Sequence, residues 1–453
     1  MPSNPNVKMF RSRIINAGVW SISGHGLSQI IRLASNLVMT RLLVPEMFGI
    51  MAVANVFLVG LALFSDIGLK QNIIHSKRGD DPLFLNTVWA IQIIRGVIIW
   101  VLALIVSGAL IFGSYTGWLS GNTVYADPLL PFVISAISFS AVINGFESTR
   151  LATSMRQLAQ KHITSMEIAS QLVGLIAMII WASIDRSIWA LVVGSIVGST
   201  AKLVYSHTLL PGLPNRWEWD SVVFREVLNF GKWIFLSSIT GFLFSNGDRL
   251  LLGGLVSSET LGIYSITFLM VNAIQLAVSK LSGAVVFPAL SEVHRDQSWK
   301  LKDTYYKFRM WIDAGILFIV GFLVVAGDAI VDLLYDERFA AAGPMLQVLS
   351  LVLVTQRYAL ADQCYLAIGK PKYMSYLIIV RMIFLYVFVI SGFHMYGMDG
   401  VLWGIVLSNF ASVPASMYLK SRCNILDVKK EIIILPMLMP GAVFGMAVVL
   451  LVD

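Results

Sequence analysis

Apolar runs long enough to cross a lipid bilayer recur along almost the whole chain, with short polar links between them. A membrane-spanning helix needs about 20 predominantly apolar residues. Runs of this kind lie at residues 15–39, 48–65, 87–112, 129–149, 166–183, 187–208, 229–254, 261–287, 307–327, 344–367, 373–393, 398–419 and 432–452. The pattern predicts twelve membrane-spanning helices and a thirteenth that stops near Asp453. This early stop suggests that the C-terminal segment is truncated.

The composition agrees with a membrane protein. Of the 453 residues, 57% are hydrophobic and 13% are charged, whereas a soluble domain carries about 25% charged residues. So few charges exclude a soluble enzyme or a nucleic-acid-binding protein, and we expect no nucleic-acid partner. Two cysteines cannot form a disulfide framework. The sequence has no metal-ligand spacing and no phosphate-binding glycine loop, so we expect no metal and no cofactor.

The net charge of +7 follows a topological pattern. With the N-terminus in the cytoplasm, 23 of the 33 Lys and Arg residues fall in cytoplasmic segments, and three lie outside: Arg41, Arg186 and Arg338. This asymmetry is what the positive-inside rule requires. The cytoplasmic group is interpreted as topological only, and it includes Lys70, Arg309 and Lys420.

The two halves of the chain carry matching motifs at an offset of 213 residues. Asn16-x-Gly18-x-Trp20 matches Asn229-x-Gly231-x-Trp233 at the start of the first and seventh spans. Because six spans return the chain to its starting side, such repeats are related by an axis along the membrane normal. We therefore predict an all-α polytopic membrane protein with two six-helix lobes and one additional helix. The predicted segments are a lobe at 1–208, a linker at 209–228, a lobe at 229–422 and the additional helix at 423–453.

Seven basic residues remain inside the predicted spans, where each costs about 2.5–3.5 kcal/mol at a helix centre. Lys202 and Lys280 lie near helix ends, from which a long side chain reaches the interface. The other five are arginines, whose guanidinium groups bind phosphate oxygens in a bidentate fashion. We expect these to form a pyrophosphate-binding cavity: Arg32, Arg95, Arg249, Arg357 and Arg381. For each arginine taken alone, the alternative is an ion pair that fixes helix packing.

Acidic partners for these arginines are expected to run short. The candidates are Asp66, Glu147, Asp248, Asp313 and Asp362, of which only Asp248 and Asp362 lie deep in a span. Asp248 and Arg249 are adjacent on a helix and point about 100° apart, so we expect them not to pair with each other. Together with Asp248 and Asp362, three further side chains are candidates for lining a hydrated cavity or for coupling to H⁺ or Na⁺: Gln29, Asn36 and Asn246.

Several short motifs occur in a fixed order along the spans. Arg41-Leu-Leu-Val-Pro-Glu-Met-Phe-Gly49 precedes Asp66-Ile-Gly-Leu69, and Asn246-Gly-Asp-Arg249 precedes Leu261-Gly-Ile-Tyr264. This set resembles the Wzx-type polysaccharide flippases of the multidrug/oligosaccharidyl-lipid/polysaccharide (MOP) superfamily. The resemblance implies alternating access between two lobes in the inner membrane of a bacterium. It also implies transfer of an oligosaccharide linked to undecaprenyl pyrophosphate, with polysaccharide assembly machinery as a partner.

Three other functions compete with this hypothesis. A cation-coupled drug or metabolite antiporter of the same superfamily would favour acidic residues in its cavity. A transporter of the major facilitator type would carry a Gly-x-x-x-Asp-Arg-x-Gly-type loop, which 70–82 lacks. A membrane glycan polymerase or ligase would carry a large external loop, and every predicted link is short.

Overall fold

The computed structural model describes the backbone of residues 5–119 and 121–452. The side chains of residues 5–17, 22, 230–237, 284 and 452 are outside the described set. Asp453, the basic residues Lys8, Arg11, Arg13 and Lys232, and the side chains of Asn16, Gly231 and Trp233 in the repeat motif therefore lie outside the described residues.

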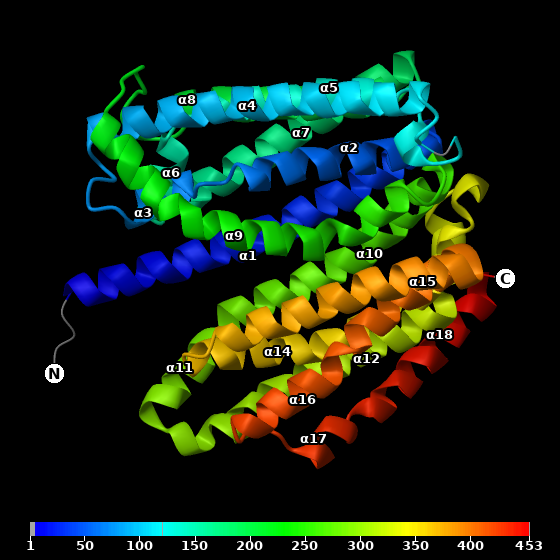
Figure 1. The fold of residues 1–453 in the computed structure, drawn as a ribbon. Helices are drawn as coiled ribbons and strands as arrows, with labels where there is room; N and C mark the ends of the chain where they lie inside the picture. Colours follow the sequence, from blue (N-terminus) through cyan, green and yellow to red (C-terminus); the bar gives the residue numbers. More distant parts are fainter. Residues whose placement is uncertain (1–4, 120, 453) are drawn as a thin grey trace. The chain divides into compact units, whose positions relative to one another are not determined.

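The described chain is built from helices. They are α1 (Pro5–Leu42), α2 (Pro45–Phe64), α3 (Leu69–His75), α4 (Pro82–Tyr115), α5 (Leu130–Gly145), α6 (Arg150–Arg156), α7 (Gln160–Ile184), α8 (Trp189–Thr208), α9 (Ser221–Gly253), α10 (Ser258–Leu281), α11 (Phe287–Asp296), α12 (Leu301–Leu334), α13 (Ala342–Ser350), α14 (Leu353–Ala367), α15 (Lys372–Phe410), α16 (Ser412–Arg422), α17 (Val428–Ile432) and α18 (Leu438–Val452). A π-helical turn at Ser282–Val286 joins α10 to α11. Every predicted apolar run falls on these helices, and Figure 1 shows their course.

Eight helical segments of the described chain are long and apolar enough to cross a membrane. A ninth arises if α5 and α6, which meet at a bend of 65°, form one broken span. The segment at 372–422 contains two predicted spans, and its backbone breaks at Tyr396 and Gly397. The run predicted at 344–367 is divided between α13 and α14. The all-α polytopic class is therefore confirmed.

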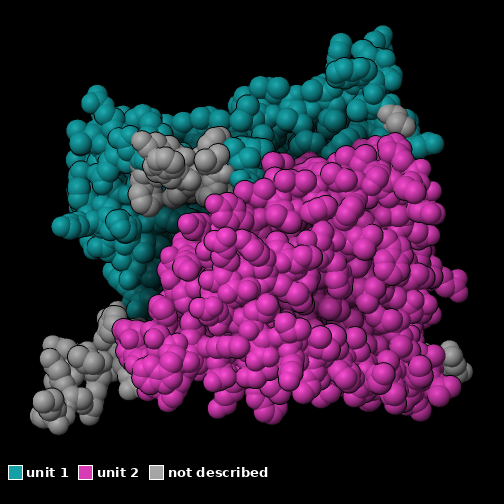
Figure 2. All heavy atoms as spheres, turned by 60° about the horizontal axis from the view of Figure 1, so that its bottom comes forward, with its two compact units in different colours: residues 1–242 teal, residues 243–453 magenta. Residues whose placement is uncertain are grey.

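The helices divide into two compact units, residues 1–242 and residues 243–453 (Figure 2). This division falls within α9, whereas the predicted lobes meet at the linker 209–228. The lobe boundaries 1–208 and 229–422 stay a prediction.

Unit 1 packs around α5, which contacts α2, α4 and α8 (Figure 1). The contact between α4 and α5 is close because glycines lie on it. A Cβ atom added to Gly96 would come within 2.4 Å of the Ala141 carbonyl oxygen, so no larger residue fits there without movement. A second close contact joins α7 to α8, and α1 packs against α7.

Unit 2 packs around α12, which contacts α13, α14 and α18. Its buried apolar residues gather near the ends of α11, α12, α14 and α15, and they include Leu290, Tyr305, Leu360 and Tyr365. Many large apolar side chains in both units face outward, among them Phe112, Ile180 and Leu450. Helices that are apolar on every face are typical of membrane spans.

Candidate functional site

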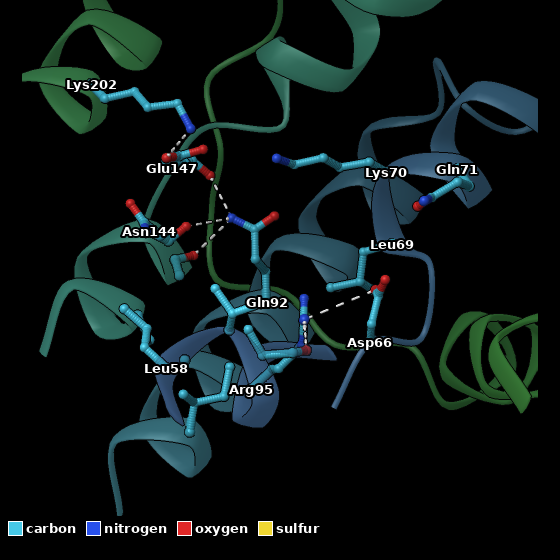
Figure 3. Close-up of a pocket in the computed structure, with 16 residues that line it drawn as sticks. Leu58, Asp66, Leu69, Lys70, Gln71, Gln92, Arg95, Asn144, Glu147 and Lys202 are labelled. Carbon is cyan, nitrogen blue, oxygen red and sulfur yellow. Dashed lines mark hydrogen bonds and ion pairs between the residues drawn. The ribbon is translucent and has the colours of Figure 1, made fainter. Parts of the chain in front are cut away.

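A polar cavity of about 380 Å³ lies within unit 1, between the ends of α2, α4, α5 and α8 (Figure 3). We call it the Lys70 cavity. Its charged lining residues are Asp66, Lys70, Arg95, Glu147 and Lys202, joined by the amides Gln71, Gln92 and Asn144. Three cations and two carboxylates leave a net charge of plus one.

The turn after α2 determines where Lys70 lies. The Asp66 carboxylate accepts a hydrogen bond from the Gly68 backbone N–H at 3.0 Å, which closes a tight turn. Gly68 has φ +64°, a left-handed conformation that favours glycine. The next residue, Leu69, is buried and begins α3. The motif Asp66-Ile-Gly-Leu69 thus positions Lys70 at the edge of the cavity.

Arg95 reaches the same place from the middle of α4. Its Nη2 donates to the Ala62 carbonyl at 2.6 Å, and its Nε donates to the Ser65 hydroxyl at 3.1 Å. It therefore satisfies a carbonyl in the last turn of α2, where a cation is favoured by the helix dipole. Nη2 also lies 3.9 Å from the Asp66 carboxylate.

Several side chains hold the break between α5 and α6, and the amide of Gln92 contacts three of its carbonyls. Gln92 Nε2 donates to the backbone carbonyls of Asn144, Gly145 and Glu147 at 3.0–3.1 Å. These carbonyls follow the end of α5, where intrahelical partners are missing. The arrangement holds the buried Glu147 carboxylate against Lys202 of α8, at an N–O distance of 2.8 Å.

Lys70 is the uncommitted cation of the cavity. Among the residues that the structure describes, none forms an ion pair or a side-chain hydrogen bond with it, whereas Arg95 and Lys202 both have carboxylate neighbours. Figure 3 shows its side chain extending from α3 toward the part of the cavity where Glu147 lies. Loss of water around the ammonium group, and then the like charge of Lys202, lower the pKa of Lys70, and the negative charges of Glu147 and Glu167 offset part of this lowering. An anion bound here would offset the like charge of Lys202.

A second cavity of about 600 Å³ adjoins the first in unit 1. We call it the Arg32 cavity. It is lined from α1 by Arg32, from α2 by Asn55, and from α7 and α8 by Glu167 and several serines. Asn144 and Lys202 line both cavities, so the two are neighbours with a shared wall.

Unit 2 holds a smaller cavity of about 220 Å³, the Asp248 cavity. Asp248 accepts a hydrogen bond from the Tyr264 hydroxyl, and Arg381 also lines this cavity. Arg249 lies next to this cavity, with its guanidinium 4.3 Å from the centre of the Phe268 ring. Its Nε is 3.8 Å from Asp248 Oδ1. The expectation that these adjacent residues do not pair was wrong, because the long arginine side chain folds back along the helix.

Arg357 lies away from the cavities, in a buried cluster of charges in unit 2. It donates to Asp313 at 3.0 Å and to the Glu431 backbone carbonyl at 2.9 Å. Arg309 and Lys420 join the same carboxylates, Arg309 contacting both Asp313 and Glu431, and Lys420 contacting Glu431 at 3.0 Å. We call these five residues the buried ion cluster; each is at most 3% exposed.

This cluster bears on two expectations. Glu431 adds a buried carboxylate that was not among the predicted acidic partners, but three cations still share the two carboxylates of Asp313 and Glu431. Arg309 and Lys420 are not simply topological charges, since neither reaches solvent. The sequence does not reveal that Arg309 and Lys420 are buried, because both lie at the ends of apolar runs. Basic residues at such positions ordinarily mark the cytoplasmic face.

The predicted site residues are thus distributed over several places. Arg95 lines the Lys70 cavity and Arg32 the Arg32 cavity, while Arg381 and Asp248 line the Asp248 cavity. Gln29, Asn36 and Asn246 lie outside these three linings. Asp362 is half-buried in α14, within electrostatic range of Arg381. Lys70, Gln92 and Lys202 were not predicted as site residues, although Lys70 directly follows the Asp66-Ile-Gly-Leu69 motif.

The comparisons with known proteins agree on one family. The model of a family described as "Polysaccharide biosynthesis protein" matches residues 38–344, which is more than half of the chain. The chain belongs to the polysaccharide biosynthesis protein family. The resemblance to Wzx-type flippases is thereby confirmed.

Several relatives with curated names align with this chain at low identity. The Escherichia coli K12 lipopolysaccharide biosynthesis protein WzxC is 23% identical over 76% of this chain and 67% of its own length. The Bacillus subtilis teichuronic acid biosynthesis protein TuaB is 23% identical over 59% of this chain and 53% of its own length. A putative O-antigen transporter of Shigella flexneri is 22% identical, with 71% and 75% covered.

Solved structures establish the fold of the family member described here. The lipid II flippase MurJ superposes with a TM-score of 0.69 at 14% identity, covering 96% of this chain and 92% of MurJ. A multidrug resistance MATE family transporter of the MOP superfamily gives a TM-score of 0.65 at 14% identity, covering 87% and 94%. The chain therefore has the fold of the MOP superfamily.

Proposed function

We propose that this protein is a flippase for polysaccharide repeat units. It moves an oligosaccharide linked to undecaprenyl pyrophosphate from the cytoplasmic to the periplasmic leaflet of a bacterial inner membrane. It works by alternating access and serves the export of exopolysaccharide, O-antigen or capsule. Family membership and relatives named for lipopolysaccharide, teichuronic acid and O-antigen support a transporter of polysaccharide units.

The observation that carries this proposal is the ammonium group of Lys70 beside Arg95 and Lys202, which has no hydrogen bond or ion pair with any residue that the structure describes. Pyrophosphate carries several negative charges, and cations bind its oxygens through charge-assisted hydrogen bonds. The carboxylates of Asp66 and Glu147 offset only two of the three cations. An anionic head group would complete the charge balance and supply Lys70 with its missing partner.

The remaining predicted residues take other roles in this proposal. Arg32 binds substrate beside the Lys70 cavity, and Arg249 and Arg381 provide cationic contacts at the Asp248 cavity. Arg357 holds helices together, because Asp313 and Glu431 already occupy its donors. Asp248 and Asp362 are the groups that a coupling H⁺ or Na⁺ would engage. The lipid bilayer and the polysaccharide assembly machinery are the expected partners.

A cation-coupled antiporter is the second candidate, and the structural likeness to a MATE transporter favours it. An antiporter for organic cations needs net negative charge where its substrate binds. The Lys70 cavity has net positive charge, which favours an anionic substrate. The lining of the Asp248 cavity balances the Asp248 carboxylate with Arg381, so it lacks the net negative charge that an organic cation needs.

Deletion of the gene tests the proposal directly. In the deletion strain, repeat units linked to undecaprenyl pyrophosphate should accumulate on the cytoplasmic leaflet while surface polysaccharide disappears. Surface polysaccharide is measured by immunoblot, and the lipid-linked intermediate by mass spectrometry of extracted lipids. Normal surface glycan, in a strain shown to contain no second flippase, would overturn the proposal.

A further inference from the structure

The Arg32 cavity differs chemically from the Lys70 cavity beside it. Its volume of about 600 Å³ lies within the range of small-molecule binding sites, roughly 300–1,000 Å³. Its two cations, Arg32 and Lys202, and its one carboxylate, Glu167, are joined by a larger number of neutral hydroxyl and amide groups, among them Asn55 on α2 and Ser195 and Ser199 on α8. Such groups can both donate hydrogen bonds to the hydroxyls of a sugar and accept hydrogen bonds from them.

Several of these groups are available to a ligand. In the described part of the chain, no ion pair or hydrogen bond ties the Glu167 carboxylate or the Asn55 amide to another residue. The neighbouring Gln171 is different, because Ser28 donates to its Oε1 at 2.8 Å and its Nε2 donates to the Ser28 carbonyl at 3.1 Å. Gln171 thus holds α1 against α7, one turn beyond Glu167, and keeps that wall of the cavity in place.

The shared wall would let one substrate occupy both cavities at once. Lys202 and Asn144 line both of them. A ligand with its pyrophosphate beside Lys70 and Arg95 would pass Lys202 and continue into the Arg32 cavity. In a lipid-linked oligosaccharide, the group attached directly to the pyrophosphate is the first monosaccharide.

We infer that the Arg32 cavity is the subsite for this first sugar, and that the Glu167 carboxylate accepts hydrogen bonds from two of its hydroxyl groups. A carboxylate has two oxygens that accept hydrogen bonds side by side, which matches a pair of neighbouring hydroxyls. Asn55 binds the same ring from the facing helix α2. This inference rests on the proposed function, because it needs a pyrophosphate in the Lys70 cavity.

The test separates the sugar from the pyrophosphate by using two probes on the purified full-length protein. The first is farnesyl pyrophosphate, and the second is the same molecule with glucose attached to the terminal phosphate. The quantity of interest is the ratio of the two dissociation constants, which measures what the sugar adds to binding. The variants are Glu167→Ala, Glu167→Gln and Asn55→Ala. Ser165→Ala is the control, since Ser165 is exposed on the same helix and lies outside both linings.

We expect the glucosylated probe to bind wild type more tightly, and Glu167→Ala to reduce this advantage roughly tenfold. Glu167→Gln should keep part of the advantage of the glucosylated probe. If Glu167→Ala fails to fold, the same ratio of dissociation constants is measured for Asn55→Ala, which should also lower it. Lys70→Ala should weaken both probes by the same factor and leave the ratio unchanged. An unchanged ratio in Glu167→Ala and Asn55→Ala, or equal weakening of both probes, would overturn the sugar subsite while the flippase proposal stands. If neither probe binds wild type, the flippase proposal itself fails.

Discussion

At the scale of single residues, Lys70 and Arg95 show why two cations in one cavity need not do the same work. Arg95 donates hydrogen bonds to the last turn of α2 and to Ser65, so its removal would disturb the packing of α2 against α4. Lys70 makes no such contact in the described chain. A substitution at Lys70 therefore reports on ligand binding with little effect on folding.

Lys70→Ala should weaken the binding of farnesyl pyrophosphate about tenfold or more. One charge-assisted hydrogen bond contributes about 1.5–3 kcal/mol, and about 1.4 kcal/mol corresponds to a tenfold change. Lys70→Arg keeps the charge and should retain most of the affinity. Lys77→Ala, an exposed lysine beyond the end of α3, is the matched control and should bind like wild type. Calorimetric titration measures all four proteins, and equal affinities for Lys70→Ala and wild type would assign the lysine no part in binding.

The same lysine predicts a pH dependence. The pKa of Lys70 is lowered by loss of water and by Lys202, so the free cavity loses this positive charge at a lower pH than an ordinary lysine would. Affinity for pyrophosphate should hold steady at neutral pH and decline as the pH rises through the Lys70 pKa, below 10.5. Lys70→Arg should abolish the decline, because a guanidinium stays protonated throughout. A decline of the same size in Lys70→Arg would place the titrating group elsewhere.

At the scale of elements, the Glu431 side chain joins the short helix α17 to the buried interior of unit 2. Glu431 accepts hydrogen bonds from Arg309, from Lys420 at 3.0 Å and from the Tyr306 hydroxyl at 2.9 Å. Without it, three buried cations would face the single carboxylate of Asp313. Leaving buried charges uncompensated is strongly unfavourable, commonly by about 3–5 kcal/mol.

Glu431→Gln keeps the shape of the side chain and removes only its charge. We expect a lower melting temperature in detergent and faster tryptic cleavage at Lys429 and Lys430, which directly precede Glu431 in α17. Asp303→Asn is the control, because the pair between Asp303 and Lys430 is exposed and such pairs contribute about 0–1 kcal/mol. Adding Lys420→Met to Glu431→Gln should restore part of the stability. Wild-type stability in Glu431→Gln would show that the cluster does not anchor α17.

Most helices could be predicted from the sequence, because a run of about 20 apolar residues in this composition has one stable conformation in a bilayer. The breaks within spans could not. The run at 129–149 ends its helix at Gly145 because Gln92 captures the carbonyls that follow, and that contact joins residues more than fifty positions apart. The run at 344–367 is divided between α13 and α14, and its apolar content alone does not predict this division.

The candidate site was predictable only in part. Arg32 and Arg95 stood out because an arginine inside an apolar run is costly, and their role in binding stays a prediction. Lys70, Lys202 and Glu147 lie where spans end, and there charge is ordinary. What joins them is the tertiary contact between α3, α8 and the link after α5, which no periodicity in the chain reveals.

At the scale of the whole molecule, the direction of transport depends on which end of the spans faces the cytoplasm. Lys70 and Lys77 follow the end of α2, and the positive-inside count predicts that this end, together with the N-terminus, lies in the cytoplasm. The link after α4, in which Trp118 is about 90% exposed, would then lie outside. This orientation would present the Lys70 cavity near the leaflet on which lipid-linked oligosaccharides are completed.

Single cysteines at these two links test the orientation. In a background with Cys364→Ser and Cys423→Ser, the variants Trp118→Cys and Lys77→Cys place a thiol at an exposed position in each link. A membrane-impermeant maleimide applied to spheroplasts should label Trp118→Cys and leave Lys77→Cys unlabelled until the membrane is permeabilised. The cysteine-free background must still export glycan, which shows that it is folded and inserted. The reverse labelling pattern would put the Lys70 cavity near the periplasmic leaflet. A lipid-linked substrate in the cytoplasmic leaflet could not enter the protein there, so the Lys70 cavity could not be the loading site.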